Sequence, residues 1–506
     1  MSKQPLPLDS AEVDARADRR QRDIGTAFAN ALKLGASLVA TWGIALVTRL
    51  FIPRYLGPER FGILNFSDAF AGTAFVFMGL GIDQYVRKEI SVRPAHTSDF
   101  IGGIIALRLI LLAVVYAGME VVLSSTHRDS QVRTLVYIMG IAQYFSVGSG
   151  TSAGLLQAAG HVNGISVLSV LIKFAWGGCI LSAIYFRLEL WAFATSLALT
   201  EGLRSIALFA LARKHLQFQM KIDVRATLAV VAAAFPFCIS GLASTVYDKI
   251  GTNVLGFTAS SREVGWLGAA AGLHGITLMV APLVSWILTP LFARAAADSR
   301  DELFRLIRRS LEFIIAIATP LTLFMALGAN IWVGILFGEA FRPAANILRV
   351  MAISTLLMYL SIVAASALAV LNYTWRMSVV FLGALLVSAA SNYVLIRHFA
   401  SAGPGAGGAA SAAAMTLTEL AIVVPLVAML GRQAIDRRLI SSTGKNLVAA
   451  AIVVALDHFV RGAFGWWTLV LDGFAYLALS VGSGGSDIKG MIQVVKASRT
   501  SRSKEA

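Results

Sequence analysis

The sequence predicts an all-α, polytopic membrane protein with about fourteen transmembrane helices, arranged as two six-helix lobes and two C-terminal helices. Three observations predict this fold class. Of 506 residues, 57% are hydrophobic and only 14% are charged, and the mean hydropathy is +0.73, which exceeds what a globular core could bury. The apolar runs are continuous and not alternating, which excludes membrane strands. A short glycine motif also recurs once in each half of the chain.

The expected helices follow from the rule that about 20 apolar residues cross the hydrocarbon core. The last two expected spans are short and carry Asp457, His458 and Asp472, so for these an interfacial or tilted position stays open. In chain order, the expected spans are residues 27–50, 63–86, 99–123, 133–155, 165–186, 190–212, 225–257, 265–292, 308–336, 346–371, 377–399, 408–430, 445–461 and 465–482.

The distribution of Lys and Arg predicts the orientation. Basic residues concentrate in alternate loops and in both terminal segments, residues 1–23 and 483–506, so both termini are expected in the cytoplasm as tails. This topology also accounts for the net charge of +15, and nucleic acid is excluded as a partner because no basic face with interleaved aromatic residues is present. Cys179 and Cys238 both fall inside expected spans, which argues against a disulfide framework or a metal site.

The repeated motif predicts the domain organisation. Leu56-Gly57 is followed by Gly62, and Leu255-Gly256 is followed by Gly265. Aligning the two copies sets helices 1–6 against helices 7–12, and an even number of spans in each half makes the repeats parallel. We therefore expect an N-lobe over residues 24–212, a C-lobe over 213–430, and helices 13 and 14 over 431–482. The loops are too short for a soluble catalytic domain, so the protein is not expected to be an enzyme.

Ionisable residues inside the expected spans are the candidate functional residues. Each costs about 2.5–3.5 kcal/mol on insertion scales, so it is expected to face a partner or a wet cavity. They are Arg49, Asp68, Arg108, Lys173, Glu201, Arg204, Asp248, Lys249, His274 and Glu419.

Several of these residues also have a purely structural interpretation. Glu201 and Arg204 stand three residues apart and could neutralise each other on one helix face. Arg49 and Lys249 lie near helix ends and could extend to the interface. A packed, hydrogen-bonded role is favoured for His274, and hydration at a cavity mouth for Asp68. For Glu419, pairing with a cation and binding a coupling ion both stay open.

The motifs resemble those of one transporter family. The turn after the first span, the stretch Gly79-Leu80-Gly81-Ile82-Asp83-Gln84-Tyr85-Val86-Arg87-Lys88-Glu89-Ile90, and the segment from Tyr247-Asp248-Lys249-Ile250 to Val264-Gly265 resemble bacterial polysaccharide flippases. These belong to the multidrug/oligosaccharidyl-lipid/polysaccharide flippase superfamily. The resemblance implies a V-shaped, two-lobe fold of the MATE type in the bacterial inner membrane. It also implies transport of a polyprenyl-diphosphate-linked oligosaccharide from the cytoplasmic to the outer leaflet, for surface polysaccharides such as O-antigen.

This substrate class suggests roles for the candidate residues. Arg108 and Lys173 lie on the order of 12–14 Å from the cytoplasmic ends of their helices, too deep for easy contact with the interface, and suit a diphosphate. The residues expected to bind the diphosphate or sugar are Arg49, Arg108, Lys173, Arg204 and Lys249. Those expected to serve gating or coupling are Asp248, Asp68, Glu201, Glu419 and His274.

Arg49 and Asp248 occupy matching positions in the two repeats, seven residues before the Leu of each motif. We expect them to form an outer gate, in which a salt bridge stabilises the inward-facing state and an arriving diphosphate competes for Arg49. No cofactor is expected, and the choice of H+ or Na+ as a coupling ion stays open. Polysaccharide polymerase and chain-length machinery are expected partners beside the lipid bilayer.

Three alternatives remain beside the main hypothesis. A lipid II flippase of the same superfamily is one, since fourteen spans are more typical of that branch. A cation-coupled multidrug exporter would need a dominant acidic site in the first lobe, and the first expected helix holds no acid. A membrane glycosyltransferase or ligase would need a long outer loop with catalytic side chains, which this chain does not offer.

Overall fold

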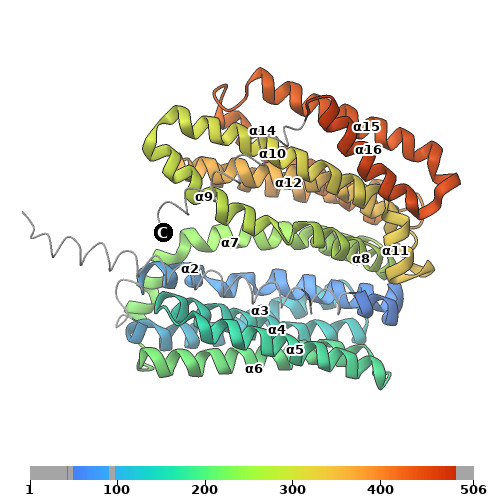
Figure 1. The fold of residues 1–506 in the computed structure, drawn as a ribbon. Coiled ribbons are helices and arrows are strands. Elements are labelled where there is room, and N and C mark those ends of the chain that lie inside the picture. The colour runs from blue at the N-terminus through green and yellow to red at the C-terminus, as the bar shows by residue number, and fades with distance from the viewer. Residues whose placement is uncertain (1–42, 44–49, 91–96, 486–506) are drawn as a thin grey trace, which may run out of the picture. The chain divides into compact units, whose positions relative to one another are not determined.

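The computed structural model describes residues 43, 50–90 and 97–485 (Figure 1). Within these residues all regular secondary structure is helical. The expected first span, 27–50, and both expected tails fall almost wholly outside the described residues. The long apolar runs form helices because a backbone in lipid must satisfy its own hydrogen bonds.

The helices of the first half match the expected spans closely beyond residue 97. Residues 50–75 are helical, and a short 3-10 helix and α2 complete this region before the first gap. The elements are η1 (Val76–Gly79), α2 (Ile82–Glu89), α3 (Thr97–Ser125), α4 (Ser130–Ala158), α5 (Val162–Tyr185) and α6 (Leu190–Leu216).

The second half continues with longer helices and several short ones. The elements are α7 (Val224–Thr258), α8 (Ser261–Leu278), α9 (Ala281–Asp298), α10 (Arg300–Leu327), α11 (Ala329–Phe337), η3 (Glu339–Phe341), α12 (Ala344–Val370), α13 (Thr374–Phe399), α14 (Ala406–Leu430), α15 (Arg437–Phe464), η4 (Gly465–Trp467) and α16 (Thr468–Gly482). Ten helical segments of the described residues are long and apolar enough to cross a membrane. The chain is a multi-pass membrane protein.

Helix boundaries differ from the expected spans at several places. The expected span 63–86 is interrupted by η1 and a turn before α2. The loop expected after Leu56 is absent, because helical structure runs through Gly57, which takes a φ of 72° in the helix. The expected span 265–292 is divided into α8 and α9 before Pro282, whose ring removes one backbone donor. The expected span 308–336 is divided into α10 and α11 at Gly328.

The described residues form two compact units, and neither is one continuous piece of chain. The first contains Phe75–Val121 and Tyr137–Ile239, and its core packs apolar residues of α2, α3, α4 and α6 such as Ile82, Ile104 and Leu155. The second contains residues 50–74, Val122–Val136 and 240–485. The lobes expected from the sequence therefore stay a prediction.

The core of the second unit lies between helices that run side by side. α12 contacts both α10 and α14 (Figure 1). The buried side chains of these helices include Ile307, Val363 and Leu426. Such apolar contact leaves few positions for polar residues in the interior. Those that occur there are the candidates for function.

Candidate functional site

The C-terminal part of α7 carries polar side chains on two of its faces. Lys249 and Asn253 are four residues apart and share one face, whereas Tyr247, Asp248 and Thr252 point into a pocket on another. α7 is therefore the element that connects the two parts of the site in the second unit.

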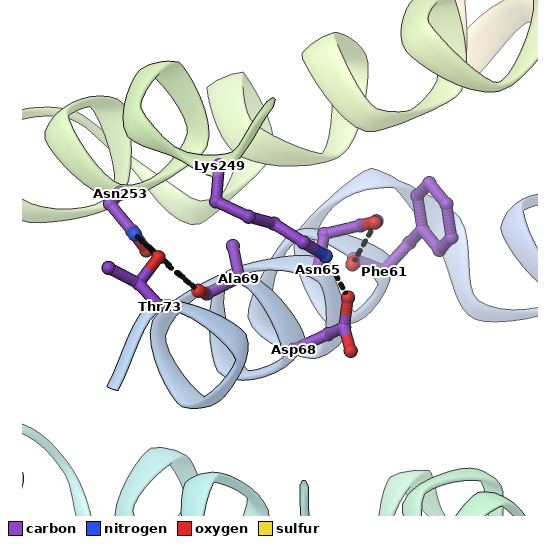
Figure 2. A network of polar contacts seen from close by, with 7 residues as sticks. All are labelled: Phe61, Asn65, Asp68, Ala69, Thr73, Lys249 and Asn253. Atoms are coloured by element: carbon purple, nitrogen blue, oxygen red, sulfur yellow. Dashed lines mark hydrogen bonds and ion pairs between the residues drawn. The ribbon is translucent and has the colours of Figure 1, made fainter. Parts of the chain in front are cut away.

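The first part is an ion pair between α7 and the helix of residues 50–75. The Lys249 Nζ atom lies 2.5 Å from Asp68 Oδ2, and the two side chains are 30% and 34% exposed. Figure 2 shows a second link one turn away, where Asn253 Nδ2 donates to Thr73 Oγ1 at 2.8 Å. Lys249 thus contacts a carboxylate, and both side chains of the pair stay partly exposed. Extension of Lys249 to the interface and hydration of Asp68 stay predictions.

The second part is a pocket of about 130 Å³ enclosed by α7, α8, α12, α13 and α14. It holds two of the expected coupling residues, and its other polar groups were not predicted from the sequence. Its lining residues are Tyr247, Asp248, Gly251, Thr252, Leu267, Ala271, His274, Met351, Ser388, Asn392, Ser411 and Met415.

Hydrogen bonds hold most polar side chains of this pocket in place. The Tyr247 hydroxyl donates to Glu419 Oε1, and Ser361 Oγ lies 3.5 Å from Glu419 Oε2. On the opposite wall, Ser411 Oγ donates to Asn392 Oδ1 at 2.9 Å. Glu419 is therefore bound by hydroxyl groups.

His274 is buried at the rim of the pocket and lies 3.3 Å from Ser354 Oγ, as a packed, hydrogen-bonded histidine would. The Asp248 carboxylate lines the same pocket, and no hydrogen bond to it is found within residues 50–90 and 97–485. A carboxylate beside amide and hydroxyl oxygens can hold a water, a proton or a monovalent cation.

A metal cluster is not formed in the described part of the chain, since no three His, Cys, Asp or Glu side chains gather there. The lining of the α7 pocket offers hydroxyl and amide oxygens and one carboxylate, that of Asp248, as potential ligands.

The two copies of the glycine motif contact each other in the second unit. A Cβ atom on Gly62 would lie 1.7 Å from the Ser261 carbonyl oxygen, and one on Gly265 would lie 1.9 Å from that of Pro58. Glu59 and Arg262 form an ion pair at 3.3 Å beside this crossing. Gly62 approaches the backbone at Ser261 and Gly265 approaches the backbone at Pro58, so the contact between the two copies is reciprocal, as in a two-fold interface.

Arg128 anchors the α3–α4 loop to the second copy of the motif. Its Nη2 atom donates to the Gly256 carbonyl at 2.5 Å, and its guanidinium lies 5.0 Å and 5.2 Å from the ring centroids of Phe66 and Phe257. Burial lowers the pKa of this guanidinium, although Asp129 opposes the effect. This loop segment therefore belongs to the second unit.

Glu263, in the second copy of the motif, caps α14. Its carboxylate accepts the backbone N–H groups of Gly405 at 2.6 Å and Gly408 at 2.9 Å. The glycine-rich segment before α14 thus binds an internal carboxylate at a helix N-terminus.

The candidate residues of the first unit contact other side chains of that unit. Arg108 is buried, and its guanidinium donates to the Met78 carbonyl at 3.0 Å and to Thr151 Oγ1 at 2.9 Å. Thr151 in turn donates to Asp83 Oδ1 at 2.6 Å, so an acidic group that the sequence reasoning did not connect with Arg108 lies close to it. Substrate binding by Arg108 stays a prediction.

Three further predicted residues, Lys173, Arg204 and Glu201, have contacts along their own helices. Lys173 Nζ lies 5.0 Å from the ring centroid of Trp176 on α5. Arg204 Nη1 lies 3.4 Å from Glu201 Oε2 on α6, which is the local neutralisation that the i, i+3 spacing allows. Arg49 lies outside the described residues, so its gate with Asp248 stays a prediction.

The sequence did not single out Tyr247, Asn253, Asn392 or Ser411 as site residues, because only Asp, Glu, His, Lys and Arg inside the spans were considered as candidates. One signal could have found Asn392. It stands four residues after Ser388 in an otherwise apolar span, and this spacing places both polar side chains on one helix face.

Comparison with known proteins agrees with this architecture. A family model described as "Polysaccharide biosynthesis protein" matches residues 27–296. The teichuronic acid biosynthesis protein TuaB of Bacillus subtilis (strain 168) is 22% identical over 326 residues, which cover 62% of this chain and 65% of that protein.

Two solved structures show the same fold. The lipid II flippase MurJ in an inward closed conformation has a TM-score of 0.69 and 13% identity, over 90% of this chain and 98% of that one. An inward-facing multidrug resistance MATE family transporter of the MOP superfamily has a TM-score of 0.61 and 12% identity, over 77% and 94%. These relatives are transporters and flippases and not enzymes. The expected resemblance is confirmed, and the chain belongs to the polysaccharide biosynthesis protein family of flippase-type transporters.

Proposed function

We propose that this protein is a flippase that moves a polyprenyl-diphosphate-linked oligosaccharide from the cytoplasmic to the outer leaflet of a bacterial inner membrane by alternating access. The observation that carries the proposal is the series of polar and ionisable side chains on α7, at membrane depth, in a chain of this family. Each ionisable group costs about 2.5–3.5 kcal/mol there, so a polar cargo or an ion best explains why they are present.

The Lys249–Asp68 contact supports a mechanism of substrate sensing. Its ammonium is neutralised by a carboxylate and remains 30% exposed, so an anionic diphosphate can compete for it. A ligand shifts a conformational equilibrium only through different interaction free energies with the two states. A diphosphate that displaces Asp68 would supply such a difference.

The reciprocal contact of the two glycine motifs supports alternating access. We expect this contact at the outer end of the bundle, because it follows the cytoplasmic-to-outer direction predicted for α7. At the crossing the backbones touch without interlocking side chains, and one exposed ion pair lies beside it. Such a joint can separate without repacking large side chains.

The α7 pocket is proposed to hold the coupling ion, H+ or Na+, at Asp248. In liposomes, wild-type transport should rise when a Na+ or pH gradient is imposed, and Asp248→Asn should lose at least tenfold of that stimulation because the carboxylate is gone. Glu339→Gln, which changes an exposed carboxylate outside this pocket, serves as the control. Equal stimulation of Asp248→Asn and wild type would exclude Asp248 as the ion ligand.

A lipid II precursor is the second candidate substrate. The MurJ match covers 90% of this chain and the MATE match only 77%, so the match to the lipid II flippase spans more of this fold. Rescue of a strain depleted of its lipid II flippase would favour this candidate. Polysaccharide polymerase and chain-length machinery are proposed as partners only for the oligosaccharide candidate.

The direct test locates the substrate in its bilayer. Deleting the gene should cause the lipid-linked oligosaccharide to accumulate in the cytoplasmic leaflet, where enzymes added from outside cannot reach it. Expression of the wild-type protein should reverse this, whereas Lys249→Gln should restore little. An unchanged leaflet distribution after deletion would refute the proposed function.

A further inference from the structure

A second polar pocket lies where α10, α15 and the end of α16 meet, and the proposed transport mechanism does not use it. We refer to it as the α15–α16 pocket. Its volume is about 100 Å³, and its lining residues are Glu312, Arg438, Ser441, Ser442, Lys445, Gly484 and Gly485.

One face of α15 supplies the donors of this pocket. Arg438, Ser441, Ser442 and Lys445 stand at positions i, i+3, i+4 and i+7, which share one side of a helix. One guanidinium, one ammonium and two hydroxyl groups therefore lie on the same side of α15.

Hydrogen bonds fix the end of α16 against this face. Ser442 Oγ donates to the Gly485 carbonyl at 2.5 Å, and Asn446 Nδ2 donates to the same oxygen at 2.9 Å. Tyr476 and Ser480 of α16 donate to Asn446 Oδ1 at 3.0 Å and 2.5 Å. The wall is thus held by buried polar contacts.

The charge of the pocket favours an anion. Arg438 Nε lies 3.6 Å from Glu312 Oε1, and the Arg438 side chain is 67% exposed. Lys445 Nζ lies beside Gly484, and no carboxylate lies within 4 Å of it in the part of the chain that the structure describes. Among the lining residues two cations outweigh the single carboxylate, and the Ser441 hydroxyl stands between them.

The surroundings favour a lipid over a free anion. α15 begins at Arg437 near the predicted cytoplasmic surface, so Lys445 lies on the order of 12 Å along the helix, at about the depth of the headgroup boundary. Beyond it α15 exposes apolar side chains where acyl chains would lie, among them Leu447, Val448, Ile452 and Leu456.

We propose that the α15–α16 pocket binds the phosphate of an anionic glycerophospholipid of the cytoplasmic leaflet. Arg438 and Lys445 offset the phosphate charge, Ser441 donates a hydrogen bond, and the acyl chains follow α15. The helix pair α15 and α16, which follows the two repeats expected from the sequence, would then recognise a lipid of its membrane.

Native mass spectrometry of the full-length protein tests this, after purification from mixed phosphatidylglycerol and phosphatidylcholine bilayers. Wild type should retain phosphatidylglycerol preferentially, and Arg438→Gln/Lys445→Gln should retain about one molecule fewer per protein. Arg376→Gln/Arg432→Gln removes the same charge outside this pocket, from positions predicted to be cytoplasmic, and should match wild type. If the double variant does not fold, Lys445→Gln alone provides the comparison.

Other ligands of the same chemistry are distinguished in further arms. Inorganic phosphate and a polyprenyl diphosphate are each added to protein in phosphatidylcholine alone, and neither should occupy the pocket. Equal phosphatidylglycerol retention by the pocket variant and wild type would overturn the proposal. Pocket-dependent binding of inorganic phosphate, or of polyprenyl diphosphate in place of phosphatidylglycerol, would also overturn it.

Discussion

Charged side chains at membrane depth in this protein contact partners of opposite charge at several places. Lys249 pairs with Asp68 between two helices, and Arg204 pairs with Glu201 along one. Arg461 pairs with Asp457 at 2.8 Å and donates to the Leu327 carbonyl at 2.6 Å. An uncompensated charge in hydrocarbon is expensive, so such pairs reduce the cost of residues that function requires.

The Lys249–Asp68 pair is expected to stabilise the second unit. Asp68→Asn and Lys249→Met should each destabilise the protein by an amount between the ~1 kcal/mol of an exposed pair and the ~3–5 kcal/mol of a buried one, because the remaining charge loses this ion-pair partner. The Asp68→Asn/Lys249→Met double variant should recover most of this loss. Thermal unfolding in detergent measures all three.

The exposed Glu59–Arg262 pair provides the matched control, since its side chains are 61% and 63% exposed. Neutralising it should change stability by less than ~1 kcal/mol. Equal losses at both pairs would contradict the importance assigned to burial.

Sequence spacing predicts the ion pairs within one helix but not those between helices. The Glu201–Arg204 pair follows from three-residue spacing on a helix and was an alternative from the start. Lys249 and Asp68 are 181 residues apart, and no local pattern connects them. Their contact depends on which helices pack together.

At the scale of secondary structure elements, α14 begins with a cap from another helix. Its first N–H groups have no intrahelical partner, and the Glu263 carboxylate of α8 accepts two N–H groups in this glycine-rich segment. The second copy of the repeated glycine motif, which contains Glu263, thus also caps the start of α14.

Removal of this cap is expected to destabilise the protein. Glu263→Ala should cost about 1–3 kcal/mol, because buried backbone donors lose their acceptor. Amide exchange at Gly405 and Gly408 should accelerate, which hydrogen-exchange mass spectrometry detects. Glu339→Gln, an exposed carboxylate, should leave that exchange unchanged, and unaltered exchange in Glu263→Ala would refute the capping role.

The glycine crossing predicts a conformational effect. Gly62→Ala and Gly265→Ala place a methyl group where a carbonyl oxygen lies within 2 Å, so the two helices must separate. In a background with Cys179→Ser and Cys238→Ser, a Glu59→Cys/Arg262→Cys pair should cross-link with a short bifunctional reagent. Either alanine variant should lower the yield by more than half.

Gly272→Ala on α8 is the control for this experiment, because a Cβ atom there meets nothing within 4 Å. It should cross-link like its parent. A full yield in Gly62→Ala would mean that the crossing tolerates a side chain and would contradict its role as a closed joint.

At the scale of the whole molecule, the distribution of basic loops predicts the orientation. A cysteine at Arg432 should react with maleimide only from the cytoplasmic side, and one at Trp467 only from the outside, because positive loops remain inside. Labelling of spheroplasts and inverted vesicles, in the background lacking Cys179 and Cys238, measures this. The reverse pattern would invert the assignment of both termini.

The sequence by itself determined the all-helical membrane fold, most helix positions after residue 97 and the transporter family, because these depend on hydropathy and short motifs. Tertiary structure alone decided which polar groups meet. Asp248 shares a pocket with Asn392 and Ser411, and Gly62 crosses Gly265, over separations that no local spacing encodes. Local sequence patterns determine which segments form helices, whereas the contacts between helices depend on how all their side chains pack together.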